Sequence, residues 1–181
     1  MTHRRHLDLL VLLLISVFVV SASAAVYYTM NAQSTATVSA APVYFIAGGD
    51  SSGILDPGTD NTYARLSLNA YPNVTLTYDQ AVNITATATK QIRLSHVSVT
   101  PNNNASVSNF ISVVFRLINA GDTEVGRLMY NTTGNIWNTP SPTGYIMINS
   151  GEELAVKVEI KAAAGASIGA STTIVIAVDV K

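Results

Sequence analysis

The sequence predicts an all-β protein with a single antiparallel β-sandwich or jelly-roll domain. After residue 63, apolar and polar residues alternate in many short segments, and this period of two is typical of half-buried strands. Gly, Pro, Asn and Asp interrupt the segments at short intervals, which favours turns between neighbouring strands. No convincing amphipathic helix follows residue 24. About ten strands at this spacing favour a sandwich.

Residues 1–24 have the organisation of a secretory signal peptide. A basic pair, Arg4 and Arg5, precedes a 12-residue apolar run over 9–20, and an A-x-A cleavage site ends at Ala24. We expect cleavage after Ala24, with cleavage after Ala25 as the alternative. The protein is therefore predicted to be secreted and extracellular, and to meet the membrane only during export.

Two alternatives would keep the leader. The apolar run is short for a membrane span of about 20 residues, but it reaches that length if residues up to 28 are counted. Type IV pilins retain such a segment as an assembly helix and are usually cut just before it, after a small residue. Residues 4–8 contain no such small residue, which favours the cleaved signal.

Composition excludes several function classes. Only 12% of the residues are charged, where a soluble domain has about 25%, and the chain after residue 24 has 8 basic and 10 acidic residues, a net charge of −2. That charge is unsuitable for holding a nucleic acid. No cysteine is present, which excludes thiol chemistry and a cysteine-zinc site. We expect no cofactor and no metal.

The stretch over 25–47 is uncharged and begins with an alternating pattern. One face carries Val26, Tyr28, Met30 and Ala32, and the other carries residues 27, 29 and 31. Such a segment needs a sheet to join, either in its own domain or in a neighbouring copy. We divide the chain into a signal peptide (1–24), an extended segment (25–36) and a sandwich domain (37–181).

The first part of the domain combines a loop with hydroxyl-rich strands. Residues 48–61 are predicted to form a solvated loop, because the spacing of their three aspartates does not match a calcium-binding loop. Strands are expected around 64–68, 74–78 and 82–88, with threonines on the outer face. In 91–100 the apolar phase slips near His96, which indicates a bulge or bend.

The second part contains the clearest strands. Residues 110–118 are apolar on both faces and predict a central strand, followed by a strand over 124–130. Residues 131–144 are predicted to be irregular, with Trp137 folded onto the core as a lid; the alternative is a ligand platform. Strict alternation over 153–160 exposes Glu153, Lys157 and Glu159, and residues 172–180 close the domain with Ile174 and its alternate neighbours inward.

The catalytic motifs that we sought are missing, so we do not predict an enzyme. His96 is the only histidine after the leader, and no G-x-S-x-G sequence is present. Two carboxylates across a cleft, as in glycosidases, remain an alternative because sequence does not show their distance.

Four sequons of the form N-x-[ST] follow the leader, at Asn73, Asn83, Asn104 and Asn131. In an exported protein they are candidate sites for N-glycans if the host has the machinery. Asn83 is expected on the polar face of a strand and the other three near turns.

The chain resembles the TasA/camelysin-type biofilm-fibre proteins, and especially the archaeal bundling pilins related to them. The resemblance depends on an A-x-A leader followed by the aromatic start AVYYT, and on the later runs QIRLSHVSV, FISVVFRLINAG and GEELAVKVEIK. Met30 follows Thr29 where that family often has an acidic residue.

The resemblance implies donor-strand assembly, in which each subunit lends its N-terminal strand to a groove in the next. Val26, Tyr28, Met30 and Ala32 would then fill the groove, and the partner would be another copy of the chain, in a filament that also has the potential to bundle laterally. A monomeric sugar-binding adhesin and a type IV pilin-like subunit are the alternative functions.

Overall fold

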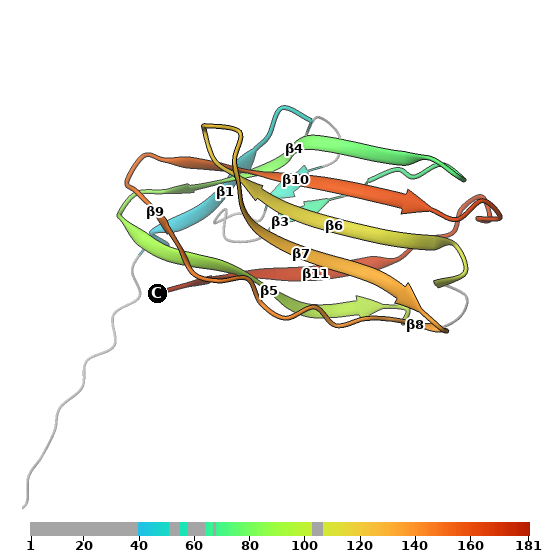
Figure 1. Cartoon of the computed structure of the whole chain (residues 1–181). Helices are drawn as coiled ribbons and strands as arrows, with labels where there is room; N and C mark the ends of the chain where they lie inside the picture. Colours follow the sequence, from blue (N-terminus) through green and yellow to red (C-terminus); the bar gives the residue numbers. More distant parts are fainter. Residues whose placement is uncertain (1–39, 51–54, 58–63, 67, 103–106) are drawn as a thin grey trace, which may run out of the picture. The chain divides into compact units, whose positions relative to one another are not determined.

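The computed structural model of the protein describes residues 40–50, 55–57, 64–66, 68–102 and 107–181. The chain divides into two compact units, and Ala40–Lys181 is the unit described here. The predicted signal peptide, its predicted cleavage positions Ala24 and Ala25, and the segment with Val26, Tyr28, Met30 and Ala32 lie outside the described residues. The prediction that the chain is all-β with antiparallel sheets is confirmed (Figure 1).

A six-stranded sheet forms the larger layer, in the order β1-β4-β10-β6-β7-β8, and all of its pairings are antiparallel. Its strands are β1 (Val43–Ala47), β4 (Thr75–Ala86), β10 (Glu153–Ala162), β6 (Phe110–Ile118), β7 (Glu124–Thr133) and β8 (Ile136–Trp137).

A three-stranded sheet, in the order β11-β5-β9, forms the smaller layer. It contains β11 (Thr173–Val180), β5 (Lys90–Thr100) and β9 (Ile146–Ile148), and a separate hairpin pairs β2 (Leu55–Pro57) with β3 (Ala64–Leu66). The core lies between the inward faces of the two layers and includes Ile92 and Leu94 of β5 and Leu154, Val156 and Val158 of β10.

The alternation in the sequence predicts these faces well. In β10 the residues Leu154, Val156, Val158 and Ile160 are buried, whereas Lys157 and Glu159 lie on the outer face with Glu153. β6 is flanked by β10 and β7, as expected for a central strand, and its outward Val114 is only 5% exposed. The two strands predicted around 74–78 and 82–88 are one continuous strand, β4, which ends at Ala86 and whose register against β10 shifts between Val156 and Val158.

Two other details refine the prediction. The expected bulge near His96 is present, because the register of β5 against β11 skips Val97. The segment 131–144 is less irregular than predicted: Asn131–Thr133 continue β7, and Ile136–Trp137 pair back onto it as β8. A short turn with Gly134 at φ 62° allows this hairpin.

The turns gather at two opposite ends of the strands. End 1 contains the segments 87–89, 119–123 and 149–152, and also Pro42, whose C=O accepts the Thr87 N–H at 2.9 Å. End 2 contains the segments 71–74 and 163–172, which are joined by a hydrogen bond from the Asn73 N–H to the Ala163 C=O at 3.3 Å. β11 runs from end 2 toward end 1, so its last residues lie at the end where the described chain begins.

Candidate interaction site: the free edge of the smaller sheet

β11 is an edge strand with one partner. Among the described residues it pairs with β5 alone, and its eight residues, TIVIAVDV, contain one charged side chain and no proline or lysine. Edge strands in natural proteins are usually short or protected by charge, proline or a bulge. The other edge strands here are short, with five residues in β1, two in β8 and three in β9. β11 is therefore the long edge without such protection.

Unpaired backbone groups of β11 point away from β5. Lys181 and Gln91 exchange both of their N–H···O=C bonds, at 2.8 and 3.2 Å, and such pairs alternate along an antiparallel ladder. The N–H and C=O groups of Val178 and Val180 therefore face the free side. The same alternation places the N–H and C=O of Leu94, which is opposite Val178, on the other flank of β5, where both bond to Thr143 at 3.0 and 2.9 Å.

The side chains near this edge are incompletely covered. Ile174, Ile176 and Val178 point into the core but are only partly buried, as predicted for their direction. Phe45 of β1 and Tyr78 of β4, on the edge side of the larger sheet, are also only partly buried. An added strand with apolar residues on one face would satisfy both the backbone groups and these side chains.

The opposite flank of β5 is closed. Trp137 is 2% exposed, its ring centroid lies 6.1 Å from that of Phe110, and its backbone N–H donates to Asn102 Oδ1 at 2.8 Å. The chain from β8 to β9 passes along this flank and bonds to Leu94 through Thr143. The prediction that Trp137 covers the core is confirmed, and its burial removes it as an exposed ligand platform.

His96 lies on the inward face of β5, where its Nδ1 is 3.1 Å from the hydroxyl of Tyr130. Tyr130 is fully buried, and this burial raises the pKa of its phenol to about 12. His96 is opposite Ile176 of β11 in the register. The histidine therefore has a hydrogen-bonding partner in the core.

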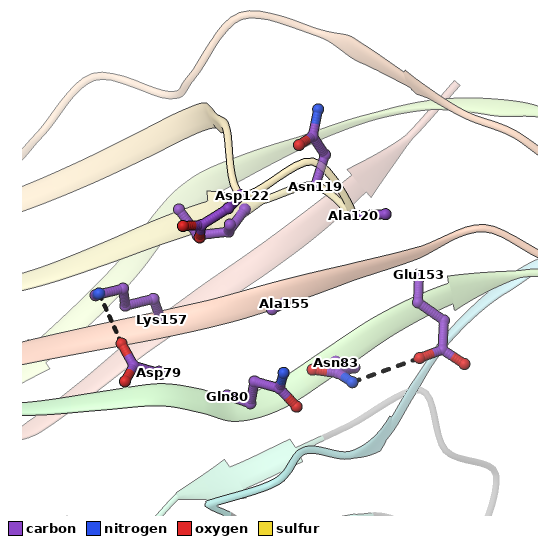
Figure 2. A pocket seen from close by; sticks show the side chains of 10 residues that line it. Asp79, Gln80, Asn83, Asn119, Ala120, Asp122, Glu153, Ala155 and Lys157 are labelled. Carbon is purple, nitrogen blue, oxygen red and sulfur yellow. Dashed lines mark hydrogen bonds and ion pairs between the residues drawn. The ribbon is translucent and has the colours of Figure 1, made fainter.

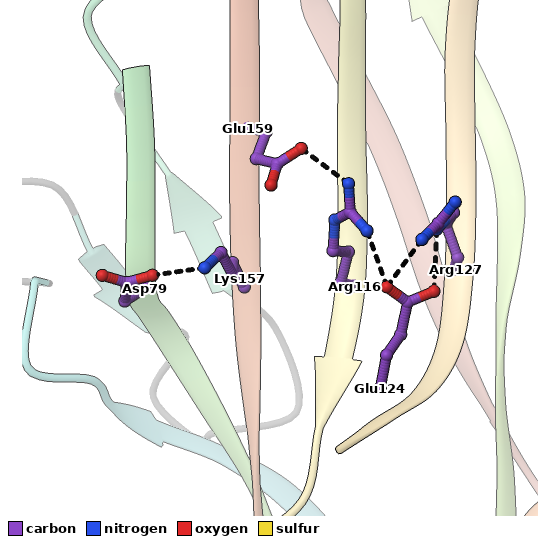
Figure 3. A network of polar contacts seen from close by, with 6 residues as sticks. All are labelled: Asp79, Arg116, Glu124, Arg127, Lys157 and Glu159. Carbon is purple, nitrogen blue, oxygen red and sulfur yellow. Dashed lines mark hydrogen bonds and ion pairs between the residues drawn. The ribbon is translucent and has the colours of Figure 1, made fainter. Parts of the chain in front are cut away.

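Charged residues cross the outer face of the larger sheet in a row (Figure 3). Glu124 accepts from both Arg116 and Arg127 at 2.7 Å, and Arg116 also donates to Glu159 at 2.7 Å. The hydrogen bond from Arg127, followed by that from Arg116, holds the pKa of Glu124 below its ordinary value. Hydrogen bonds to Glu124 and Glu159 raise the pKa of Arg116. The ion pairs of this network connect β10, β6 and β7, and the opposite charges neutralise each other.

A polar cleft of about 580 Å³ lies on the same face, beside the 119–123 turn (Figure 2). Its polar side chains are largely occupied with each other: Lys157 Nζ is 2.6 Å from Asp79, and Asn83 Nδ2 is 3.5 Å from Glu153. Asn119 Oδ1 accepts two backbone N–H bonds within its own turn. No group of three His, Asp or Glu side chains that could hold a metal ion occurs among the described residues.

Three of the four sequons lie among the described residues, and each has a different environment. Asn73 is exposed in the turn at end 2, with φ 59°, a left-handed conformation that asparagine tolerates. Asn83 lies in β4 between β1 and β10, on the polar face as predicted, and its Oδ1 is buried without a hydrogen-bond partner. Asn131 lies in β7, two residues before this strand ends at Thr133 and the turn with Gly134 follows. Asn104 lies outside the described residues.

No protein-family model and no curated protein matches the chain. In the part of the chain that the structure describes, none of the elements is a helix with the length and apolar character needed to cross a membrane. The interpretation of the site therefore depends on its own geometry.

The sequence analysis did not predict the free edge of β11. The signal that could have indicated it is that only one of the eight strand residues is charged.

Proposed function

We propose that this protein is a secreted structural subunit of an extracellular filament, in which the N-terminal strand of one copy pairs with the free edge of β11 in the next. The observation that carries the proposal is the eight-residue edge, apolar and without lysine or proline, beside partly covered core residues. Such an edge in an exported monomer would pair non-specifically unless a defined strand occupied it.

The segment around 25–36 has the properties that this edge requires. It is uncharged, and its alternate residues Val26, Tyr28 and Met30 present one apolar face, which matches the inward residues of β11. Burying large apolar side chains is worth roughly 1.5–3 kcal/mol each, and the ladder of backbone bonds slows dissociation. Because the donor and the acceptor are different surfaces of one chain, the contact does not close and it propagates into a filament.

The test separates the donor from the acceptor. Deletion of residues 25–33 should give a folded monomer that accepts a strand but donates none. Val178→Pro should give a monomer that donates a strand but does not accept one. The N–H of Val178 faces the free edge and is not bonded to β5, so its loss should leave the β5–β11 pairing intact. Without that N–H, β11 cannot complete the hydrogen-bond ladder with an incoming strand. Each variant alone should remain monomeric in light scattering, and an equimolar mixture should form a dimer only.

Normal filaments from the deletion variant would overturn the proposal, as would a mixture that stays monomeric while both variants have native far-UV circular dichroism. A matched control is Ala177→Pro, which lies one residue away and removes an N–H on the β5 side of the ladder. It should lower the free energy of unfolding instead of selectively blocking assembly.

The two alternative functions make different demands. A sugar-binding module with Trp137 as its platform is disfavoured because that side chain is buried against Phe110. A pilin-like subunit would retain the leader, and N-terminal sequencing of the mature protein distinguishes it: a start at Ala25 or Val26 favours the donor-strand filament, and a start near Leu7 favours the pilin.

A further inference from the structure

The direction of β11 restricts how a strand can reach it. β11 runs from end 2 to end 1, and the described chain begins at end 1, where Pro42 bonds to Thr87. A strand that belongs to the same copy must finish at end 1 to continue into β1. If it lay beside β11 it would run parallel to β11, in a domain where every observed pairing is antiparallel.

A strand from a neighbouring copy has no such restriction. If it pairs antiparallel with β11, its last residue leaves the acceptor at end 2 and continues into end 1 of its own domain. The connection over residues 37–42 is six residues long and spans at most about 20 Å. End 1 of the donor must therefore lie close to end 2 of the acceptor.

End 2 has the surface that such a contact needs. Large apolar side chains are exposed there: Ile168 at 103%, Tyr71 at 57%, Val74 at 44% and Ile111 at 42%. Backbone and side-chain bonds connect their segments, since Asn73 bonds to Ala163 and the Ser167 N–H donates to Asn109 Oδ1 at 2.6 Å. Exposed apolar residues gathered at one place on a surface often mark an interaction site.

We propose that the donor strand runs antiparallel to β11 and that end 1 of each donor docks on the apolar end 2 of its acceptor, giving a polar stack of identically oriented subunits. This inference deepens the proposed function and depends on it. The apolar residues of end 2 would form an interface between the two domains. Without this interface, the donor strand and its linker would be the only connection between neighbouring subunits. The occupant of end 2 is a second copy of this chain.

Disulfide crosslinking tests the strand direction. The chain contains no cysteine of its own, so only the introduced cysteines can form disulfides. Thr173 is the first residue of β11 and Lys181 directly follows its last, so they lie eight residues and roughly 26 Å apart, whereas a disulfide requires Cα atoms within about 7 Å. Tyr27 and Thr35 lie near the start and the end of the donor segment, also eight residues apart, and both belong to its polar alternating set with residues 29 and 31. An antiparallel strand that places residue 27 opposite residue 181 places residue 35 opposite residue 173.

We expect filaments of the double variant Tyr27→Cys/Lys181→Cys, and those of Thr35→Cys/Thr173→Cys, to give ladders of covalent oligomers on non-reducing gels. The exchanged pairs, Tyr27→Cys/Thr173→Cys and Thr35→Cys/Lys181→Cys, should not. Ladders from the exchanged pairs would overturn the antiparallel stack while leaving the donor-strand filament intact. Crosslinks within single chains, or no crosslinks from any pair, would overturn the donor-strand filament itself.

The variant Ile168→Asp tests the docking of the two ends. The Ile168 side chain is fully exposed in the monomer, so its replacement should not affect folding. We expect the concentration needed for filament formation to rise at least about tenfold, with the melting temperature of the monomer unchanged. The matched control is Met129→Asp, an exposed apolar residue on the outer face of β7, away from both ends. Equal effects of the two variants, or none from Ile168→Asp, would overturn the docking.

Discussion

The two flanks of β5 in the smaller sheet have different neighbours. On one flank, the chain between β8 and β9 passes along β5, Thr143 bonds to Leu94, and Trp137 is 2% exposed. On the other flank β11 pairs with β5, but its own outer edge has no strand partner in the described structure, and its inward side chains are only partly buried. Among the described residues, one flank of the core is covered by the chain itself, and the other ends at β11.

This difference has a physical consequence. A residue on the closed flank contributes its full stabilisation in the monomer, because no partner is needed to exclude water. Under the proposed assembly, a residue on the β11 flank contributes part of its stabilisation in the monomer and would gain the rest when a donor strand is added. Variants on the closed flank should therefore affect folding, and variants on the β11 flank should affect assembly more than folding.

The largest expected effect is on the closed flank. Trp137→Ala removes a large buried side chain from its contact with Phe110, so we expect the free energy of unfolding to fall by about 3–5 kcal/mol. Chemical denaturation measures this loss. Ile136→Ala, the adjacent residue of β8 at 57% exposure, is the control and should change stability by about 0.5 kcal/mol or less. Similar losses from both variants would contradict the lid interpretation.

A second effect comes from the buried phenol of Tyr130. Its folded pKa of about 12 lies above the ordinary value of 10.0, so the unfolded state ionises first as the pH rises. The contribution of Tyr130 to stability is unchanged below about pH 9 and is lost as the pH rises through 10 to 12, by roughly 2 kcal/mol at pH 12. Urea denaturation at pH 9 and 11 measures the fall. Tyr130→Phe should lack this contribution, and an identical pH dependence in that variant would contradict it.

The comparison is sharpest between two isoleucines on adjacent strands. Ile92 of β5 is 0% exposed, whereas Ile176 of β11 is partly exposed at the free edge. We expect Ile92→Ala to cost about 2–5 kcal/mol in the monomer and Ile176→Ala only about 1–2 kcal/mol. Ile176→Ala should weaken assembly more than it weakens folding, as compared by light scattering and denaturation. Equal folding costs would show that the β11 flank is already complete.

The sequence alone predicted much of the fold because strand periodicity reports the local environment of each side chain. Strict alternation in 153–160 identified the buried and exposed faces of β10, and the phase slip near His96 identified the bulge. Both signals are local, since they depend on which side of a strand meets the core. The burial of Trp137 was also predictable, because a large aromatic residue rarely stays in water.

Only the tertiary structure decided which edge remains open. The residues of β11 alternate like those of any half-buried strand, and nothing in their order shows that β5 is their single neighbour among the described strands. Two other features also depend on residues far apart in the chain. One is the contact between Tyr130 and His96, and the other is the position of Ile168 at the same end of the domain as Tyr71 and Val74. Periodicity determines which face of a strand is buried, whereas the neighbours along its edge depend on how distant strands come together, and that order is fixed only when the chain folds.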